Sequence, residues 1–414
     1  MAKDQERCSF CGKKKSDVNL LIAGIEAHIC DACVDQAVAI VKEENGTKSR
    51  NYDAKKFELL KPVDMKKHLD QYVIGQDEAK RILSVAVYNH YKRITQKPAK
   101  KNTDDVEIEK SNIIMVGETG TGKTLLARTI AKMLHVPFCI ADATVLTEAG
   151  YVGEDVESVL TRLLQVSDYN VEAAEKGIVF IDEIDKIARK SDNPSITRDV
   201  SGEGVQQAML KLLEGSVVNV APQGGRKHPE QRMIQINTEN ILFICGGAFD
   251  GIEKIIGSRL KTNMIGYTSV SDRDKLDKDN LVQYVAPQDL KSFGLIPELV
   301  GRLPIITHLK PLSCDTLKRI LTEPRNALSK QYTKLFDMDY IKLTFDDAVF
   351  DLVVNKSIEY KLGARGLRTI LEVIMTDAMF DMPSDSKHEQ ELHITLKLAE
   401  EKINKIDRSL LLVA

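Results

Sequence analysis

The stretch NIIMVGETGTGKT at residues 112–124 decides the fold. Its first five residues form an apolar run typical of a buried strand, and the helical pattern LLARTIAKML follows it. A strand, a glycine-rich turn and a helix in this order are the context of a phosphate-binding loop, in which Lys123 reaches the outer phosphates and Thr124 offers a hydroxyl to Mg²⁺. The loop therefore predicts ATP and Mg²⁺, a glycine-rich turn without ligand being the alternative. The candidate nucleotide-binding residues here are Gly117, Glu118, Thr119, Gly120, Thr121, Gly122, Lys123, Thr124 and Leu125.

A second motif, GIVFIDEIDK at residues 177–186, is an apolar strand that ends in two adjacent carboxylates. Asp182 is expected to hold Mg²⁺, directly or through water, and Glu183 to polarise the water that attacks the terminal phosphate. An acidic pair of this kind is by itself often only the start of a helix. Downstream of a phosphate loop, it predicts an ATPase.

The fold class predicted around these motifs is α/β. Strand-like runs at residues 137–141 and 241–245 alternate with helical stretches, which favours a parallel sheet with helices on both faces. From about Pro311 the pattern changes to helices with two short strands. We therefore expect a large ATPase domain at residues 63–310 and a smaller, mainly helical domain at residues 311–414.

Four cysteines lie close to the N-terminus as two CxxC pairs separated by 18 residues, a spacing typical of a four-thiolate zinc site. Four thiolates complete the zinc tetrahedron and leave no open position, so the metal would be structural. The alternatives are a pair of disulfides, unligated thiols or iron. We expect a zinc-binding domain at residues 1–45 and a polar linker at residues 46–62. The candidate zinc ligands are Cys8, Cys11, Cys30 and Cys33.

The composition of the 414-residue chain is that of a globular protein, with 43% hydrophobic and 29% charged residues and a net charge of -3. No apolar run is long enough to span a membrane and no secretory leader is readable, so we expect a cytoplasmic protein without membrane partners. The near-neutral charge argues against nucleic acid as a partner. The cysteines outside the first 33 residues, Cys139, Cys245 and Cys314, are expected to be buried, inert thiols.

Taken together, these residues resemble the ClpX family, the AAA+ unfoldase subunits of the Clp protease, from Cys8 to about Leu398. The four-cysteine module distinguishes this family from the HslU type of unfoldase. The resemblance implies a homohexameric ring that uses ATP to unfold tagged or unfolded protein substrates and threads them into a ClpP-type peptidase. It implies no peptidase activity in the chain itself, and possible adaptor proteins that bind the zinc module.

The resemblance also assigns further residues to the nucleotide. Val73 and Ile74 match residues that pack against adenine, although a purely structural place in the core is the alternative. Arg302 matches an arginine finger, a catalytic residue that acts on ATP held by the neighbouring subunit, and this role implies a closed ring. Arg365 matches a sensor in the second domain that reaches back to the nucleotide.

Four segments match the family's contacts with substrate and peptidase. Residues 150–153, GYVG, match a pore loop that grips the polypeptide, residues 190–204 a second pore loop, and residues 226–228 a basic loop at the pore entrance. A short apolar tripeptide at residues 265–267 matches the segment that docks on the peptidase ring. The candidate residues are Tyr151, Val152, Arg226, Lys227 and His228 for the pore, and Ile265, Gly266 and Tyr267 for docking.

The sequence departs from the family at two places, and at a third position it differs from many AAA+ proteins. Glu118 stands where the family commonly has proline, and Tyr267 where it usually has phenylalanine. The run ILFIC ends in Cys245 and Gly246, without the Asn or Thr that senses the γ-phosphate in many AAA+ proteins, so that sensor has no assignment. Two alternative functions remain at this point: a disaggregating chaperone that works without a peptidase, and a nucleic-acid remodelling ATPase.

Overall fold

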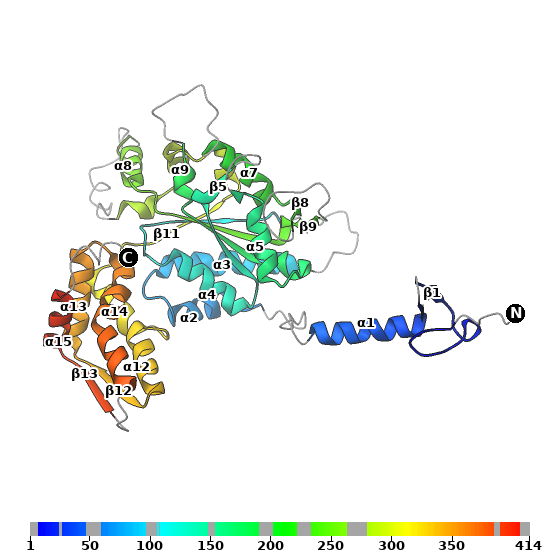
Figure 1. Cartoon of the computed structure of the whole chain (residues 1–414). Helices are drawn as coiled ribbons and strands as arrows, with labels where there is room; N and C mark the ends of the chain where they lie inside the picture. Colours follow the sequence, from blue (N-terminus) through cyan, green and yellow to red (C-terminus); the bar gives the residue numbers. More distant parts are fainter. Residues whose placement is uncertain are drawn as a thin grey trace. The chain divides into compact units, whose positions relative to one another are not determined.

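The computed structural model describes residues 7–24, 27–46, 59–96, 106, 108–147, 154–189, 202–221, 233–262, 280–384 and 390–405 (Figure 1). The chain forms two compact units, Met1–Phe57 and Glu58–Ala414. None of the described helices combines the length and the apolar character needed to cross a membrane.

The described part of the N-terminal unit contains one long helix and a small two-stranded sheet. Its elements are η1 (Lys15–Asp17), β1 (Leu21–Ala23), the antiparallel partner strand β2 (His28–Cys30) and α1 (Asp31–Gly46). Large apolar side chains are exposed in it, among them Phe10, Leu20 and Ile22, whereas Cys8 and Cys30 are buried. Among the described residues of this unit, cysteines therefore occupy the place that an apolar core would take in a larger domain.

The second unit is built on a five-stranded parallel sheet with strand order β11-β3-β10-β7-β4. Because all strands run the same way, their carboxyl ends meet at one edge, where Val116, Asp182 and Gly247 end three neighbouring strands. Ligands bind at this edge in open α/β sheets. The strands are β3 (Ile113–Val116), β4 (Phe138–Asp142), β7 (Ile178–Asp182), β10 (Leu242–Gly247) and β11 (Ile305–His308).

Helices cover both faces of the sheet, because successive side chains of a strand point to opposite sides. Ile113 and Met115 of β3 pack with α2 (Pro62–Asp70), α3 (Asp77–Thr95) and α4 (Lys123–Leu134). Ile114 and Val116 belong to the other cluster, with α5 (Ser158–Val166), α7 (Glu203–Glu214) and α10 (Pro297–Gly301). The predicted α/β sheet with two helical layers is confirmed.

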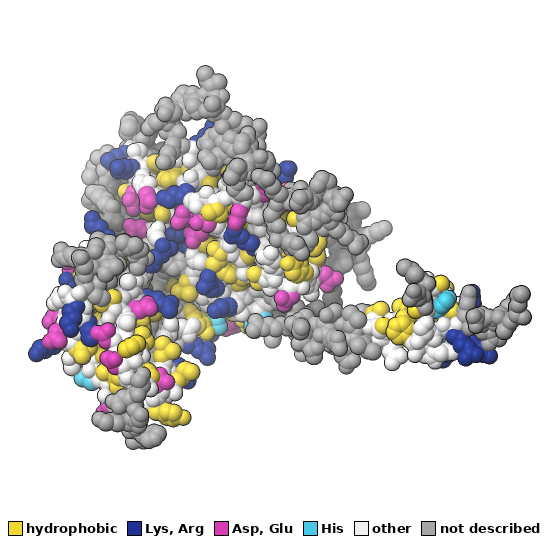
Figure 2. All heavy atoms as spheres, viewed as in Figure 1, with side chains coloured by type: hydrophobic (Ala, Val, Ile, Leu, Met, Phe, Trp, Pro, Cys, Tyr) yellow, Lys and Arg dark blue, Asp and Glu magenta, His cyan; other side chains and the backbone are white. Residues whose placement is uncertain are grey.

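The remaining elements of this part are short. They are η2 (Ala143–Val145), β5 (Leu146–Thr147), β6 (Glu154–Asp155), α6 (Val171–Ala174), η3 (Ile184–Ile187), β8 (Val217–Val220), β9 (Ile234–Asn237), η4 (Thr238–Asn240), α8 (Ile252–Thr262), η6 (Leu281–Tyr284) and α9 (Pro287–Phe293). On the face shown in Figure 2, acidic and basic side chains are interspersed over this unit.

The C-terminal part is mainly helical, as predicted. Its own core contains fully buried Leu321, Val349 and Leu367. Its elements are α11 (Cys314–Thr322), α12 (Leu328–Met338), β12 (Ile341–Phe345), α13 (Asp347–Glu359), α14 (Gly363–Asp381), η7 (Met382–Ser384), β13 (Gln390–Ile394), which pairs in parallel with β12, and α15 (Leu396–Asn404).

The three cysteines expected to be inert differ in their surroundings. Cys139 and Cys245 are buried in the sheet, and burial raises the pKa of each thiol to about 12. Cys314 is exposed, so the expectation was wrong for this residue. It is the first residue of α11, directly after the N-cap Ser313, and a helix start at the surface leaves its side chain in solvent.

Candidate active site and metal centre

The four N-terminal cysteines form one cluster. Their sulfur atoms all lie within 4.8 Å of one another, and the Sγ atoms of Cys11 and Cys30 are 3.6 Å apart. A tetrahedral zinc ion with Zn–S bonds of about 2.3 Å requires sulfur atoms about 3.8 Å apart. All seven cysteines of the chain are free thiols, so the disulfide alternative does not match this structure. The cluster therefore fits a zinc ion.

The protonation of the cluster also favours a cation. Burial opposes ionisation of Cys8, but backbone amides, including that of Cys30, stabilise its thiolate and lower its pKa to about 6. The hydrogen bond with Cys11, followed by burial, raises the pKa of Cys33 to about 12. Four neighbouring thiolates thus require a positive charge between them, which a divalent zinc ion supplies.

The phosphate loop begins where β3 ends, and its first glycine is required by packing. The amide of Gly117 donates to the carbonyl of Gly247 at 3.1 Å, which ties the loop to β10. A Cβ at Gly117 would lie 2.9 Å from both Cβ and the carbonyl oxygen of Leu309. Any larger residue would therefore push the loop away from the segment that follows β11.

The lysine of the loop is buried beneath it. Nζ of Lys123 donates to the carbonyl oxygens of Gly117 at 2.5 Å and Glu118 at 2.9 Å, and Oγ1 of Thr121 donates to Glu118 at 2.7 Å. The carbonyl of Glu118 therefore holds the loop together while its side chain is exposed. Gly120 and Gly122 have φ angles of 84° and 103°, in the left-handed region that glycine adopts without strain.

Oxygen donors suited to Mg²⁺ lie beside the loop. Oγ1 of Thr124 donates to Oδ2 of Asp182 at 3.1 Å, so the first turn of α4 and the end of β7 present a hydroxyl and a carboxylate to one point. Mg²⁺ prefers such hard oxygen ligands and keeps several waters. The two residues therefore fit the predicted magnesium site.

Glu183 lies directly after this site on a strained turn. Its φ of 57° places a non-glycine residue in the left-handed region, its amide donates to Oδ1 of Asp182 at 3.0 Å, and its side chain is exposed. Backbone strain of this kind costs about 1–3 kcal/mol and clusters at functional sites. The turn leaves the carboxylate where water can reach it.

The end of β10 explains why the sensor position has no polar side chain. A Cβ at Gly246 would lie 2.7 Å from the ring of Phe180, and one at Gly247 would lie 2.7 Å from Oδ1 of Asp185. Asp185, which carries no predicted role, is buried and accepts a hydrogen bond from the amide of Ala248 at 3.0 Å. Its place in the same acidic motif as Glu183 was the only signal for it in the sequence.

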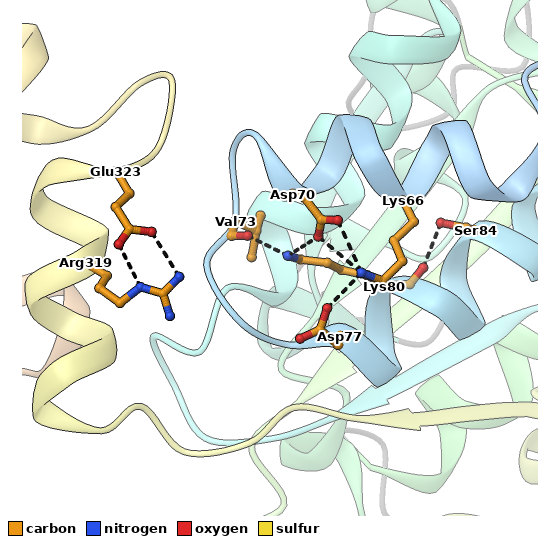
Figure 3. Close-up of polar contacts among 8 residues, drawn as sticks. All are labelled: Lys66, Asp70, Val73, Asp77, Lys80, Ser84, Arg319 and Glu323. Atoms are coloured by element: carbon orange, nitrogen blue, oxygen red, sulfur yellow. Dashed lines mark hydrogen bonds and ion pairs between the residues drawn. The ribbon is translucent and has the colours of Figure 1, made fainter.

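A buried lysine, Lys80, holds the backbone of the segment that is predicted to contact adenine. Nζ of Lys80 donates to the carbonyl of Val73 at 2.6 Å and to Asp70 at 2.7 Å, and Lys66 in turn pairs with Asp70 (Figure 3). Val73 and Ile74 are both buried. Their burial agrees with a core position and with an apolar wall for the base.

The same segment is bonded both to the residues that follow β11 and to the C-terminal part of the unit. The side-chain amide of Gln76 donates to the carbonyl of Lys310 at 2.8 Å and accepts from its amide at 2.9 Å. The amide of Arg325 donates to the carbonyl of Gln71 at 2.7 Å. Neither bond was apparent in the sequence, because a side chain that pairs with distant backbone leaves no periodic pattern.

The two predicted arginines have different surroundings. Burial lowers the pKa of Lys123, and the charge of Arg365 is among the further causes. The neighbouring amide of Ala364 lies 3.8 Å from a Cβ built on Gly120. Arg302, at the end of α10, is exposed and pairs with Glu214 at 3.0 Å.

The predicted pore and docking residues lie outside the described residues. These are Tyr151, Val152, Arg226, Lys227, His228, Ile265, Gly266 and Tyr267, together with residues 190–201 of the second pore loop.

Comparison with known proteins finds family models and similar proteins along the chain. Residues 6–43 match a ClpX C4-type zinc finger, residues 108–306 an AAA domain of the Cdc48 subfamily, and residues 312–396 the C-terminal D2-small domain of ClpB protein. Three similar proteins each carry the name ATP-dependent Clp protease ATP-binding subunit ClpX. The Bacteroides thetaiotaomicron protein is 65% identical over 100% of this chain and 99% of its own length. The Bacteroides fragilis protein is 64% identical over 97% and 96%, and the Porphyromonas gingivalis protein 65% identical over 93% of both.

These matches agree with the geometry at both sites. The zinc-finger match spans the four clustered thiols, and the AAA match spans the phosphate loop and the carboxylates beside it. The chain therefore belongs to the ClpX family, and it is an AAA ATPase that takes ATP and Mg²⁺ as cofactors and holds a structural Zn²⁺.

Proposed function

We propose that six copies of this chain form a ring that hydrolyses ATP to unfold proteins, threads them through its pore and delivers them to a ClpP-type peptidase. The names of its relatives, ATP-binding subunits of an ATP-dependent Clp protease, support the peptidase as partner. The observation that carries the proposal is the approach of α14 to the phosphate loop, where the amide of Ala364, next to Arg365, lies 3.8 Å from a Cβ built on Gly120, because the C-terminal part then contributes to the nucleotide site. Hydrolysis at such a site can change the angle between the two parts.

Each residue of the site has a proposed task. Lys123 would neutralise the outer phosphates, and Thr124 with Asp182 would hold Mg²⁺, which supplies positive charge against the phosphate oxygens. Glu183 would accept the proton of the attacking water. Arg302 would bring its charge to the nucleotide of the neighbouring subunit, which requires a closed ring of identical subunits.

The other assignments extend this proposal. We place the zinc-binding domain at residues 1–45, the linker at 46–62, the large ATPase domain at 63–310 and the small domain at 311–414, and we place the protein in the cytoplasm. Val73 and Ile74 would pack against adenine, and Arg365 would sense the nucleotide. The substrate contacts would be Tyr151, Val152, Arg226, Lys227 and His228, and the peptidase contacts Ile265, Gly266 and Tyr267.

The proposal is tested with the purified chain, ATP, a ClpP-type peptidase and a tagged fluorescent protein. We expect a hexamer that co-purifies with the peptidase, and loss of fluorescence only while ATP is hydrolysed. Tyr151→Ala should keep most of the ATPase activity and lose unfolding, because the ring of this side chain would no longer grip the chain. Unchanged unfolding of the substrate by that variant would contradict the gripping role of Tyr151.

The two alternatives give different results in the same assay. A chaperone that works without a peptidase would unfold substrate normally without degrading it. If degradation occurs and deletion of residues 265–267 leaves it unchanged, the docking role of these residues is wrong. A nucleic-acid remodelling enzyme would bind DNA or RNA with an affinity that falls steeply with salt. The net charge of -3 and the interspersed charges in Figure 2 support the protein substrate instead.

A further inference from the structure

The short helix α10, whose C-cap is Arg302, is held at its C-terminal end by a buried amide. Nδ2 of Asn112 donates to the carbonyl of Arg302 at 2.9 Å and to the carbonyl of Leu213 at 3.1 Å. Asn112 is only 1% exposed, so both of its donors are used where water does not compete. It therefore joins the end of α10 to the last turn of α7, whose final carbonyls have no partner within the helix.

A second buried amide holds the other end of the same helix. Gln206 is fully buried, and its Oε1 accepts from the amide of Ile296, the residue before α10, at 2.8 Å. Its Nε2 donates to the carbonyl of Ile187 at 2.8 Å. Ile187 ends the turn that follows Glu183, so Gln206 links the start of α10 to the segment of the predicted catalytic base.

The position of Arg302 depends on such anchors, because α10 is only five residues long. Helices shorter than about 12 residues do not hold their own conformation in water, and tertiary contacts must do so. Leu299 and Leu303 supply apolar packing, with side chains that are fully buried. Packing alone leaves rotation and sliding of the helix poorly defined, whereas hydrogen bonds at both ends fix its register.

We propose that Asn112 and Gln206 are positioning residues for the arginine finger, an inference that rests on the proposed role of Arg302. The two amides hold α10 between the start of β3 and the two ends of α7. The backbone from which the Arg302 side chain extends toward the nucleotide of the next subunit is thereby held in one place. A misplacement of about 1 Å at such a group costs up to about 100-fold in rate.

The test is a double-mutant cycle in the full-length chain. Asn112→Asp keeps the size of the side chain but replaces the NH₂ that donates to Arg302 by an oxygen. Gln206→Met keeps a similar size but removes the oxygen that accepts from the amide of Ile296 at the other end. We expect each to lower kcat about tenfold with the KM for ATP changed less than about twofold, because the finger acts in the transition state. Arg302→Ala should lower kcat about 1000-fold. In the Arg302→Ala background, Asn112→Asp should cause no further loss.

The control variant is Thr161→Val, which removes a buried donor that bonds the carbonyl of Ala221 elsewhere in the same domain. It should leave kcat unchanged. Equal losses from Asn112→Asp with and without Arg302 would overturn the positioning role. An unchanged kcat in both amide variants, with Arg302→Ala inactive, would overturn it while leaving the proposed function intact. An active Arg302→Ala would overturn the finger and this inference together.

Mixed rings separate the finger from any effect on the variant's own nucleotide. A subunit with Glu183→Gln should hydrolyse ATP at least about 100-fold more slowly, so it contributes to turnover almost only by presenting its finger. We compare equal mixtures of wild type with Glu183→Gln and of wild type with Glu183→Gln, Asn112→Asp. The second mixture should hydrolyse ATP at about half the rate of the first, because half of the wild-type sites then face an impaired finger. Equal rates in the two mixtures would overturn the inference.

Discussion

The zinc module and the ATPase sheet are each stabilised internally, but by different interactions. In the module the cysteines converge on one point, while Phe10 and Leu20 are 72% and 59% exposed. In the sheet, Ile113 and Phe180 are fully buried between helices. A structural metal does in the first region what apolar burial does in the second. The ligand should therefore decide the folding of the module, whereas the nucleotide site should be formed by the sheet in advance.

Removal of zinc should have the largest effect and should be confined to one region. Structural zinc contributes about 10–16 kcal/mol in small domains. We expect a chelator to unfold residues 1–45, seen as rapid proteolysis of this segment, while ATP hydrolysis continues. Cys30→Ser should lose zinc in the same way, whereas Cys314→Ser, at an exposed thiol outside the cluster, should retain it. A module that resists proteolysis without metal would contradict the comparison.

Loss of the proposed catalytic base should show the opposite pattern, with the fold intact and ATP hydrolysis lost. Glu183→Gln keeps the size of the side chain but removes its basicity, so kcat should fall about 10²–10⁴-fold. ATP binding and zinc content should not change. Glu172→Gln, at an acidic residue in the first turn of α6, is the control and should be fully active. Normal ATP hydrolysis by Glu183→Gln would contradict the assignment of Glu183 as the base.

How much the sequence predicts depends on how local each feature is. The phosphate loop lies in thirteen consecutive residues, and the strand and helix around it were found as Ile113–Val116 and Lys123–Leu134. The cysteine cluster was predictable because each CxxC brings two ligands together. The bonds from Asn112 to Arg302 and from Gln76 to Lys310 were not, since they join residues 190 and 234 positions apart.

The strand order could not be predicted from the sequence either. Parallel strands pair across long connections, and the apolar runs of the different strands look alike. The two glycines at the end of β10 show a third limit. The sequence shows only that Gly246 lacks the polar side chain of a sensor. The structure shows that no side chain has room at this position. Only the ring of Phe180, on the neighbouring strand, supplies the reason.

Filling that position should destabilise the sheet by steric overlap. Gly246→Ala would place a Cβ 2.7 Å from a ring that is itself fully buried, so we expect a loss of up to about 3 kcal/mol in the free energy of unfolding. Gly257→Ala, in α8, is the matched control, because its Cβ would meet Leu281 at an ordinary 3.6 Å. It should be neutral or slightly stabilising. The measurement is denaturant unfolding of both variants, and equal stabilities would contradict the packing account.

The smallest effect is a pH dependence that acts on both regions through different groups. Burial, together with the charge of Arg93, lowers the pKa of His90 from 6.5 to about 3, and the neutral ring bonds the carbonyl of Asn240 at 3.0 Å. Between pH 6.5 and 3 the unfolded chain therefore binds the proton and the folded chain does not, so stability is lost as the pH falls through this window.

At pH 5 this difference costs the sheet about 2 kcal/mol relative to neutral pH. His90→Gln replaces the titrating ring by an amide that can still donate to Asn240, so the loss of unfolding free energy between pH 7.5 and pH 5 should shrink by that amount. The zinc content of the same samples should fall with acid equally in both proteins, because it depends on the cysteine thiolates. An unchanged pH dependence in His90→Gln would show that the acid sensitivity of the sheet lies in other groups, and the two regions would then no longer be separable by a single buried side chain.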